Sequence, residues 1–181
     1  MNAENKPGLP TRRQFVATSA LGSAAMAVGC KRVAQGNWDF LNDEQARTLT
    51  ALCDQIIPAD DFPSASQAGV LNYIDRQLAR AYQRHRDDYR DGLQRALELS
   101  RSRFRQDPAA LTQKQQLEWV SAIEKGDRSF FEMVRRHTFE GYYGSPRHGG
   151  NLDAVSWKML GLAEPPNLGR SQYDLSKGGR S

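Results

Sequence analysis

The 181-residue chain has little of what a cofactor site needs. It contains two cysteines, whereas iron–sulfur clusters need several and covalently bound haem needs the pattern C-x-x-C-H. The glycine pattern G-x-G-x-x-G, which binds dinucleotides between a strand and a helix, does not occur in it. The sequence therefore predicts that this chain itself holds no flavin, nicotinamide, haem or cluster.

Residue patterns for metal binding and for nucleophilic catalysis are also missing. The three histidines, His85, His137 and His148, lie far apart, and none belongs to an H-E-x-x-H motif. No G-x-S-x-G motif presents a serine nucleophile. His137 follows the apolar face of an expected helix, so a packed histidine is the better interpretation than a metal ligand. We predict no catalytic and no metal-binding residue.

No apolar run is long enough for a transmembrane helix of about 20 residues. The best candidate, 15–29, is short and rich in Ala, Gly and Ser, and Arg12 and Arg13 stand just before it. Paired arginines ahead of a weakly hydrophobic stretch indicate a twin-arginine export signal. We assign residues 1–29 to this signal, with Arg12, Arg13 and Phe15 as its key residues. That route carries folded proteins, so a chain without a cofactor motif is expected to escort another protein.

Each cysteine has more than one interpretation. Cys30 follows the apolar run as the lipidated residue of a lipoprotein would, but Ala25-Met26-Ala27 also fits ordinary signal cleavage. Cys53 stands at helical spacing among Leu49, Leu52 and Ile56, which is typical of a small buried side chain. A Cys30–Cys53 disulfide is a further possibility in an oxidising compartment.

The charge balance gives no reason to expect a nucleic-acid partner. The whole chain carries +4, and residues 1–29 account for +2 of it, with three basic residues against Glu4. The rest is only weakly basic. The arginine-rich stretch 76–105 is interrupted by acidic residues, so it fits a solvated helix face with paired charges, or a strip that docks an acidic partner.

Apolar spacing predicts an all-α fold: a single compact domain of five to six helices at 41–162, after a tether at 30–40 and before an extended C-terminal arm at 163–181. Asn42 and Thr112, each followed three residues later by Gln, are typical N-caps. The expected helices run from Asn42 to Pro58 and over 67–84, 88–105, 112–126, 128–140 and 154–160. No alternating run indicates a strand.

The glycine-rich segment after 140 is the best candidate for a partner interface. Tyrosine and tryptophan are enriched at protein interfaces, although here the aromatics could instead close the core over the last helix. The candidate interface residues are Tyr142, Tyr143, Arg147, His148, Gly149, Gly150, Asn151 and Trp157.

Four stretches give the chain a family resemblance. Apart from the arginine pair, they lie in residues 40–162. They are the arginine pair, Leu49-x-x-Leu52-Cys-Asp-Gln-Ile-Ile-Pro-Ala-Asp60, Gly69-Val70-x-x-Tyr73-Ile74-Asp75, and Gly141-Tyr142-Tyr143 through Gly149-Gly150-Asn151 to Trp157. In this order and spacing the chain resembles the gluconate 2-dehydrogenase subunit 3 family. It departs from that pattern at 161–165, where the family often has Gly-Tyr-Pro-Gly.

The resemblance implies a small, non-catalytic subunit of a membrane-associated, periplasmic sugar or polyol dehydrogenase. Its expected partners are an FAD-dependent catalytic subunit, the twin-arginine export machinery and, in some complexes, a subunit with haem c. The small subunit would supply the export signal and help its partner mature. The alternative is a free-standing envelope lipoprotein that acts as an interaction module.

Overall fold

The computed structural model describes residues 37–162, and these residues contain helices and loops but no strand. Arg12, Arg13, Phe15, Cys30 and the arm 163–181 lie outside the described residues. The α-helices are α2 (Asp43–Ile56), α3 (Val70–Ala79), α4 (Arg86–Phe104), α5 (Gln113–Gly126), α6 (Arg128–Tyr143) and α7 (Val155–Met159). Short 3-10 helices are η2 (Gln83–His85), η3 (Pro108–Ala110), η4 (Pro146–His148) and η5 (Leu152–Ala154). The predicted all-α fold is confirmed.

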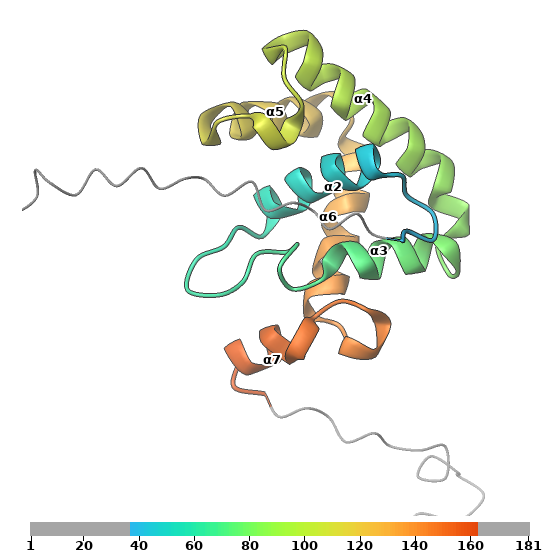
Figure 1. Cartoon of the computed structure of the whole chain (residues 1–181), viewed down its shortest axis with the longest axis vertical. Helices are drawn as coiled ribbons and strands as arrows, with labels where there is room; N and C mark the ends of the chain where they lie inside the picture. Colours follow the sequence, from blue (N-terminus) through green and yellow to red (C-terminus); the bar gives the residue numbers. More distant parts are fainter. Residues whose placement is uncertain (1–36, 163–181) are drawn as a thin grey trace, which may run out of the picture. The chain divides into compact units, whose positions relative to one another are not determined.

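Helix α6 is the centre of the domain. It contacts α2, α3, α4, α5 and α7, and Figure 1 shows it running between the other helices, with α5 near one end and α7 near the other. Phe130, Val134 and His137 of α6 are all buried. Within 37–162, no helix combines the length and the apolar character that crossing a membrane requires.

Both predicted capping boxes are present. The Asn42 side chain accepts a hydrogen bond from the Gln45 amide, and Thr112 accepts one from the Gln115 amide. Each glutamine side chain binds back to the N-cap backbone. These pairs satisfy amides that a helix leaves without partners at its first turn, so the starts of α2 and α5 were readable from sequence.

The second helix is shorter than the predicted 67–84. Gly69 has a left-handed φ of 79°, a conformation that favours glycine, and α3 begins only after it. At the other end, Arg86 donates to the carbonyl oxygens of Leu78 at 2.8 Å and Ala79 at 3.2 Å. The Arg86 side chain thus occupies carbonyl oxygens that would accept backbone hydrogen bonds if α3 continued. The chain goes on instead as η2.

The fifth helix is longer than the predicted 128–140. It continues to Tyr143 through Gly141, which the glycine content had assigned to an irregular segment. A Cβ atom at Gly141 would lie 2.9 Å from Cδ1 of Tyr73. The glycine therefore lets α3 and α6 approach closely rather than ending the helix.

A buried carboxylate fixes the segment that leads into α2. Asp75 of α3 is 3% exposed and accepts hydrogen bonds from the amides of Asp39 at 2.7 Å, Phe40 at 3.0 Å and Leu41 at 2.9 Å. A buried carboxylate is costly unless its oxygens find donors, and here three backbone amides supply them. The path of residues 39–41 is thus set by one side chain.

The arginines of α4 form the solvated face that the sequence favoured. Arg90 pairs with Asp87 at 2.7 Å, Arg95 with Asp127, and Arg101 with both Glu44 and Asp107. Isolated surface pairs of this kind add little stability, typically less than about 1 kcal/mol each. The face is therefore mixed in sign rather than a continuous basic strip.

Candidate partner interface

The two glycines of the predicted interface are packed inside the domain. Gly149 and Gly150 are both buried, and a Cβ atom at Gly150 would lie 2.2 Å from the carbonyl oxygen of Gly141. No side chain fits in that space, because the obstacle is helix backbone. Gly150 therefore allows the segment after α6 to pack back against that helix. Its role in the structure is packing, and it is not accessible to a partner.

Asn151 is also packed inside the domain. It is fully buried, its side-chain amide donates to the Gly144 carbonyl at 2.8 Å, and its side-chain oxygen accepts from the Ser156 amide at 2.9 Å. Its φ of 44° is in the left-handed region, which asparagine tolerates better than most residues. One side chain thus links the end of α6 to α7, and its hydrogen-bonding atoms are used internally.

The aromatic candidates divide between the core and the surface. Tyr142 is 2% exposed and donates its hydroxyl to the Pro63 carbonyl at 2.8 Å; burial raises the pKa of this phenol. Trp157 is partly exposed and donates its indole N–H to the Tyr143 carbonyl at 2.8 Å. Tyr143 itself is exposed. The core interpretation therefore fits Tyr142, whereas Tyr143 and part of Trp157 remain accessible to a partner.

Arg147 and His148 lie at the surface. Both are exposed residues of η4, and the Arg147 Nε donates to Nε2 of His148 at 3.1 Å. Of the eight predicted interface residues, Tyr143, Arg147, His148 and part of Trp157 are accessible to another protein. Gly149, Gly150, Asn151 and Tyr142 instead shape the segment that presents them.

A partly buried polar cluster between α3, α4 and α6 was not predicted from the sequence. The Tyr82 hydroxyl donates to the Glu140 carboxylate and lies 3.0 Å from the Tyr73 hydroxyl. His137 stacks on Tyr82 with ring centres 4.3 Å apart, and its Nδ1 lies 3.0 Å from the Tyr89 hydroxyl. These residues are distant in sequence, and only the crossing of three helices brings them together.

The electrostatics of this cluster favour neutral side chains. Burial is the main cause that lowers the pKa of His137 to about 4, and burial also raises the pKa of Tyr89. For Tyr82, burial and the hydrogen bond to Glu140 both raise the pKa. Nearby, Cys53 is a free, fully buried thiol 3.3 Å from Thr138 Oγ1, and burial raises its pKa to about 12. A neutral imidazole and a protonated thiol, both closed off from solvent, are typical of packing.

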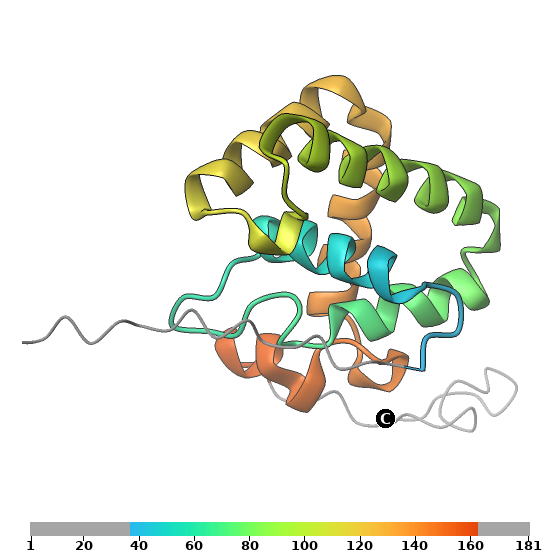
Figure 2. The ribbon, with the colours of Figure 1, turned by 45° about the horizontal axis from the view of Figure 1, so that its top comes forward.

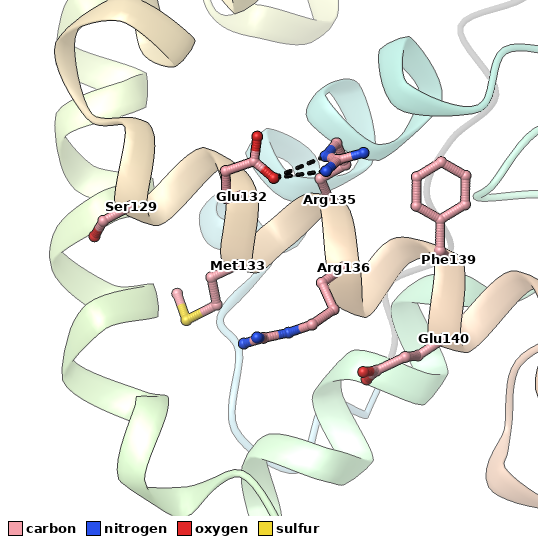
Figure 3. Close-up of a pocket in the computed structure, with 7 residues that line it drawn as sticks. All are labelled: Ser129, Glu132, Met133, Arg135, Arg136, Phe139 and Glu140. Carbon is pink, nitrogen blue, oxygen red and sulfur yellow. Dashed lines mark hydrogen bonds and ion pairs between the residues drawn. The ribbon is translucent and has the colours of Figure 1, made fainter.

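A hollow lies along α6 (Figure 3). It measures about 480 Å³ and lies among Ser129, Glu132, Met133, Arg135, Arg136, Phe139 and Glu140. Arg135 pairs with Glu132 at 2.7 Å. Because the lining comes from one helix, the hollow is a shallow depression open to solvent. Within 37–162, no group of three His, Cys, Asp or Glu side chains could hold a metal ion.

Comparison with known proteins places the helical domain in a family. The family model described as gluconate 2-dehydrogenase subunit 3 matches residues 43–163, which is two thirds of the chain. Searches of curated proteins and of solved structures gave no match. The family description names one subunit of a multi-subunit dehydrogenase. The match covers every α-helix from α2 to α7, and the chain therefore belongs to the gluconate 2-dehydrogenase subunit 3 family.

Proposed function

We propose that this chain is the non-catalytic small subunit of an FAD-dependent sugar or polyol dehydrogenase of the gluconate type, and that it escorts the catalytic subunit through export and maturation. The observation that carries the proposal is the family match, which extends over the whole helical domain. Arg12 and Arg13 support it, because a twin-arginine signal serves proteins that cross the membrane already folded.

The chemistry of the described residues supports a non-catalytic role. A general base works best when its pKa lies near the operating pH and when its nitrogen or oxygen can reach a substrate. His137 has a pKa near 4 and is 2% exposed. Cys53 is fully buried with a pKa near 12, so it is not an activated nucleophile.

Cofactor binding and the export signal would lie on different chains of the complex. FAD and the substrate would bind to the catalytic subunit, and a third subunit with haem c would pass electrons onward in complexes that have one. This chain would contribute the export signal and a folded helical partner. The complex would lie in the periplasm, held at the membrane through a partner or through a lipid on Cys30.

Deletion of this chain tests the escort role. We expect the flavoprotein subunit to remain in the cytoplasm of the deletion strain, with dye-linked dehydrogenase activity lost from the periplasm and restored by a plasmid copy of the chain. Active flavoprotein in the periplasm of the deletion strain would refute the escort role.

Two measurements on the purified chain test the remaining parts. A chain purified alone should show neither flavin absorption nor dye-linked sugar oxidation, and either signal would contradict a non-catalytic subunit. Mass spectrometry of the mature N-terminus should show whether Cys30 carries acyl chains or whether cleavage follows Ala27.

A further inference from the structure

The large apolar side chains that remain exposed are unevenly distributed. Within 37–162, seven large apolar residues are 38–55% exposed, and six of them belong to the segment after α2, the last turns of α6, and the region from η5 to Leu162, just beyond α7. We call these six the apolar end: Phe62, Phe139, Tyr143, Leu152, Leu160 and Leu162. The seventh, Leu117, lies on α5.

Direct contacts connect the α6 and α7 parts of the apolar end. The rings of Phe139 and Tyr143 stack with their centres 6.1 Å apart. The Tyr143 carbonyl accepts the indole N–H of Trp157, and the Trp157 carbonyl accepts the amide of Leu162 at 2.8 Å. The exposed side chains therefore stand on a backbone that hydrogen bonds hold in place.

Further contacts bring in the segment between α2 and α3. The residue after Phe62 accepts the Tyr142 hydroxyl through its carbonyl. The Leu152 amide donates to the Ala68 carbonyl at 2.9 Å, and the Leu152 side chain lies against Gly69. Figures 1 and 2 show α7 and this loop at the same end of the domain, away from α5.

Single exposed apolar residues are normal on protein surfaces, but a group of them on one rigid region marks a contact surface. We propose that the apolar end is the surface on which the catalytic subunit of the dehydrogenase packs. This inference rests on the proposed function and adds the site of contact. The buried residues Gly150 and Asn151 then act beneath the surface, because they hold α6 and α7 in the arrangement that presents it.

The charges around the apolar end favour a protein over a lipid bilayer as the occupant. Asp60 and Asp61 precede Phe62, and Asp153 follows Leu152, whereas basic groups such as Lys158 lie among the same residues. Faces that bind membranes are typically basic, because bacterial and cytoplasmic leaflets carry anionic lipids. A surface with both signs of charge around apolar side chains is instead the usual anatomy of a protein interface.

Leu117 offers a matched control for the test. It is 55% exposed, as are Leu160 and Leu162. The full-length chain would be co-expressed with the flavoprotein subunit from the same organism and purified through a tag on the small subunit. We expect Leu160→Ser with Leu162→Ser to lower the FAD recovered per mole of small subunit by about tenfold, the effect of removing interface anchors. Phe139→Ser tests the α6 half of the surface in the same way, and Leu117→Ser should leave the yield unchanged.

The outcomes separate this inference from the proposed function. Leu117, Leu160 and Leu162 are each 55% exposed, so thermal unfolding of the free subunit should hardly change in the leucine variants, and a loss of FAD recovery in the double variant then reports contact. If the wild type binds flavoprotein but both apolar-end variants bind equally well, the inference fails alone. If the wild type recovers no flavoprotein, the proposed function fails and the inference with it. Wild-type binding to phosphatidylglycerol vesicles, or a dimer lost in the double variant, would assign the surface to lipid or to a second copy and would also overturn the inference.

Discussion

At the scale of single residues, this domain uses its buried polar side chains to satisfy backbone groups that the helices leave open. Asn151 binds one carbonyl and one amide, Asp75 binds three amides, and Tyr142 binds the Pro63 carbonyl. Each such bond also avoids the cost of an unsatisfied buried group, about 1–3 kcal/mol. These residues therefore hold loops in place, and the loops position the exposed surface.

The close approach at Gly150 gives the first prediction. Gly150→Ala would place a methyl group 2.2 Å from the Gly141 carbonyl oxygen. Because both partners are backbone, relief requires moving the segment away from α6, and we expect a loss of about 3 kcal/mol in the free energy of unfolding. Urea denaturation followed by circular dichroism measures it.

Gly126→Ala is the matched control for that change. A Cβ atom at Gly126 meets nothing within 4 Å, and the residue ends α5. Alanine is a better helix former than glycine, so this variant should be neutral or more stable by about 0.5 kcal/mol. Equal stability of the two variants would contradict the packing role assigned to Gly150.

His137 gives a prediction about pH. Burial lowers its pKa from the ordinary 6.5 to about 4, so the unfolded chain takes up this proton at a higher pH than the folded chain does. The stability that depends on neutral His137 is complete above about pH 6.5 and is lost as the pH falls towards 4. We expect the loss to be roughly 1–3 kcal/mol, since one pKa unit corresponds to about 1.4 kcal/mol.

Urea unfolding at about pH 7 and about pH 4.5 measures this contribution. The variant His137→Gln keeps a polar side chain near Tyr89 but cannot titrate, so its stability should fall less over that range than the wild type's. His148→Gln, at an exposed site, should leave the wild-type pH dependence intact. An unchanged pH dependence in His137→Gln would show that other groups cause the acid sensitivity.

At the scale of helices, local signals were readable from the sequence and tertiary ones were not. The starts of α2 and α5 were predicted because Asn42 and Thr112 form capping boxes within four residues. The end of α3 was missed because Arg86 binds the last carbonyls from the next helix. The end of α6 was missed because Gly141 is required by contact with Tyr73, a residue 68 positions earlier in the sequence.

The link between α3 and the segment before α2 is testable at the same scale. In Asp75→Asn, one carboxylate oxygen becomes an NH₂ group facing the Asp39 amide, which also donates. We expect the variant to lose about 1–3 kcal/mol of stability. Hydrogen exchange should speed up at the amides of residues 39–41.

Asp61→Asn provides the control for Asp75→Asn. Asp61 is an exposed residue of the segment between α2 and α3, and we expect its stability and exchange rates to match the wild type. If the exchange of amides 39–41 is as slow in Asp75→Asn as in the wild type, the carboxylate does not hold that segment.

At the scale of the whole molecule, the sequence did not distinguish the exposed from the buried residues of the candidate interface. It selected the segment from Tyr142 to Trp157 because of its aromatics and glycines. The structure buries the glycines, Asn151 and Tyr142 and leaves Tyr143, Arg147 and His148 exposed. Leu160 and Leu162 were not selected, because an exposed leucine and a buried one look alike in sequence.

We propose that the whole molecule combines two parts with separate roles. The helical domain belongs to the gluconate 2-dehydrogenase subunit 3 family. Residues 1–29 are predicted to be its export signal. In an escort, the export signal acts on a protein that is bound to the helical domain. The export of the catalytic subunit should therefore depend on the signal of this chain.

The most direct test is the location of the flavoprotein when Arg12 and Arg13 are changed together to lysine. The substitution keeps both positive charges and lies outside residues 37–162, so the complex should still assemble. We expect dye-linked activity and flavoprotein to accumulate in the cytoplasm of this strain, whereas Lys31→Gln with Arg32→Gln should leave both in the periplasm. Normal periplasmic activity in the Arg12→Lys, Arg13→Lys strain would contradict this dependence of export on the signal.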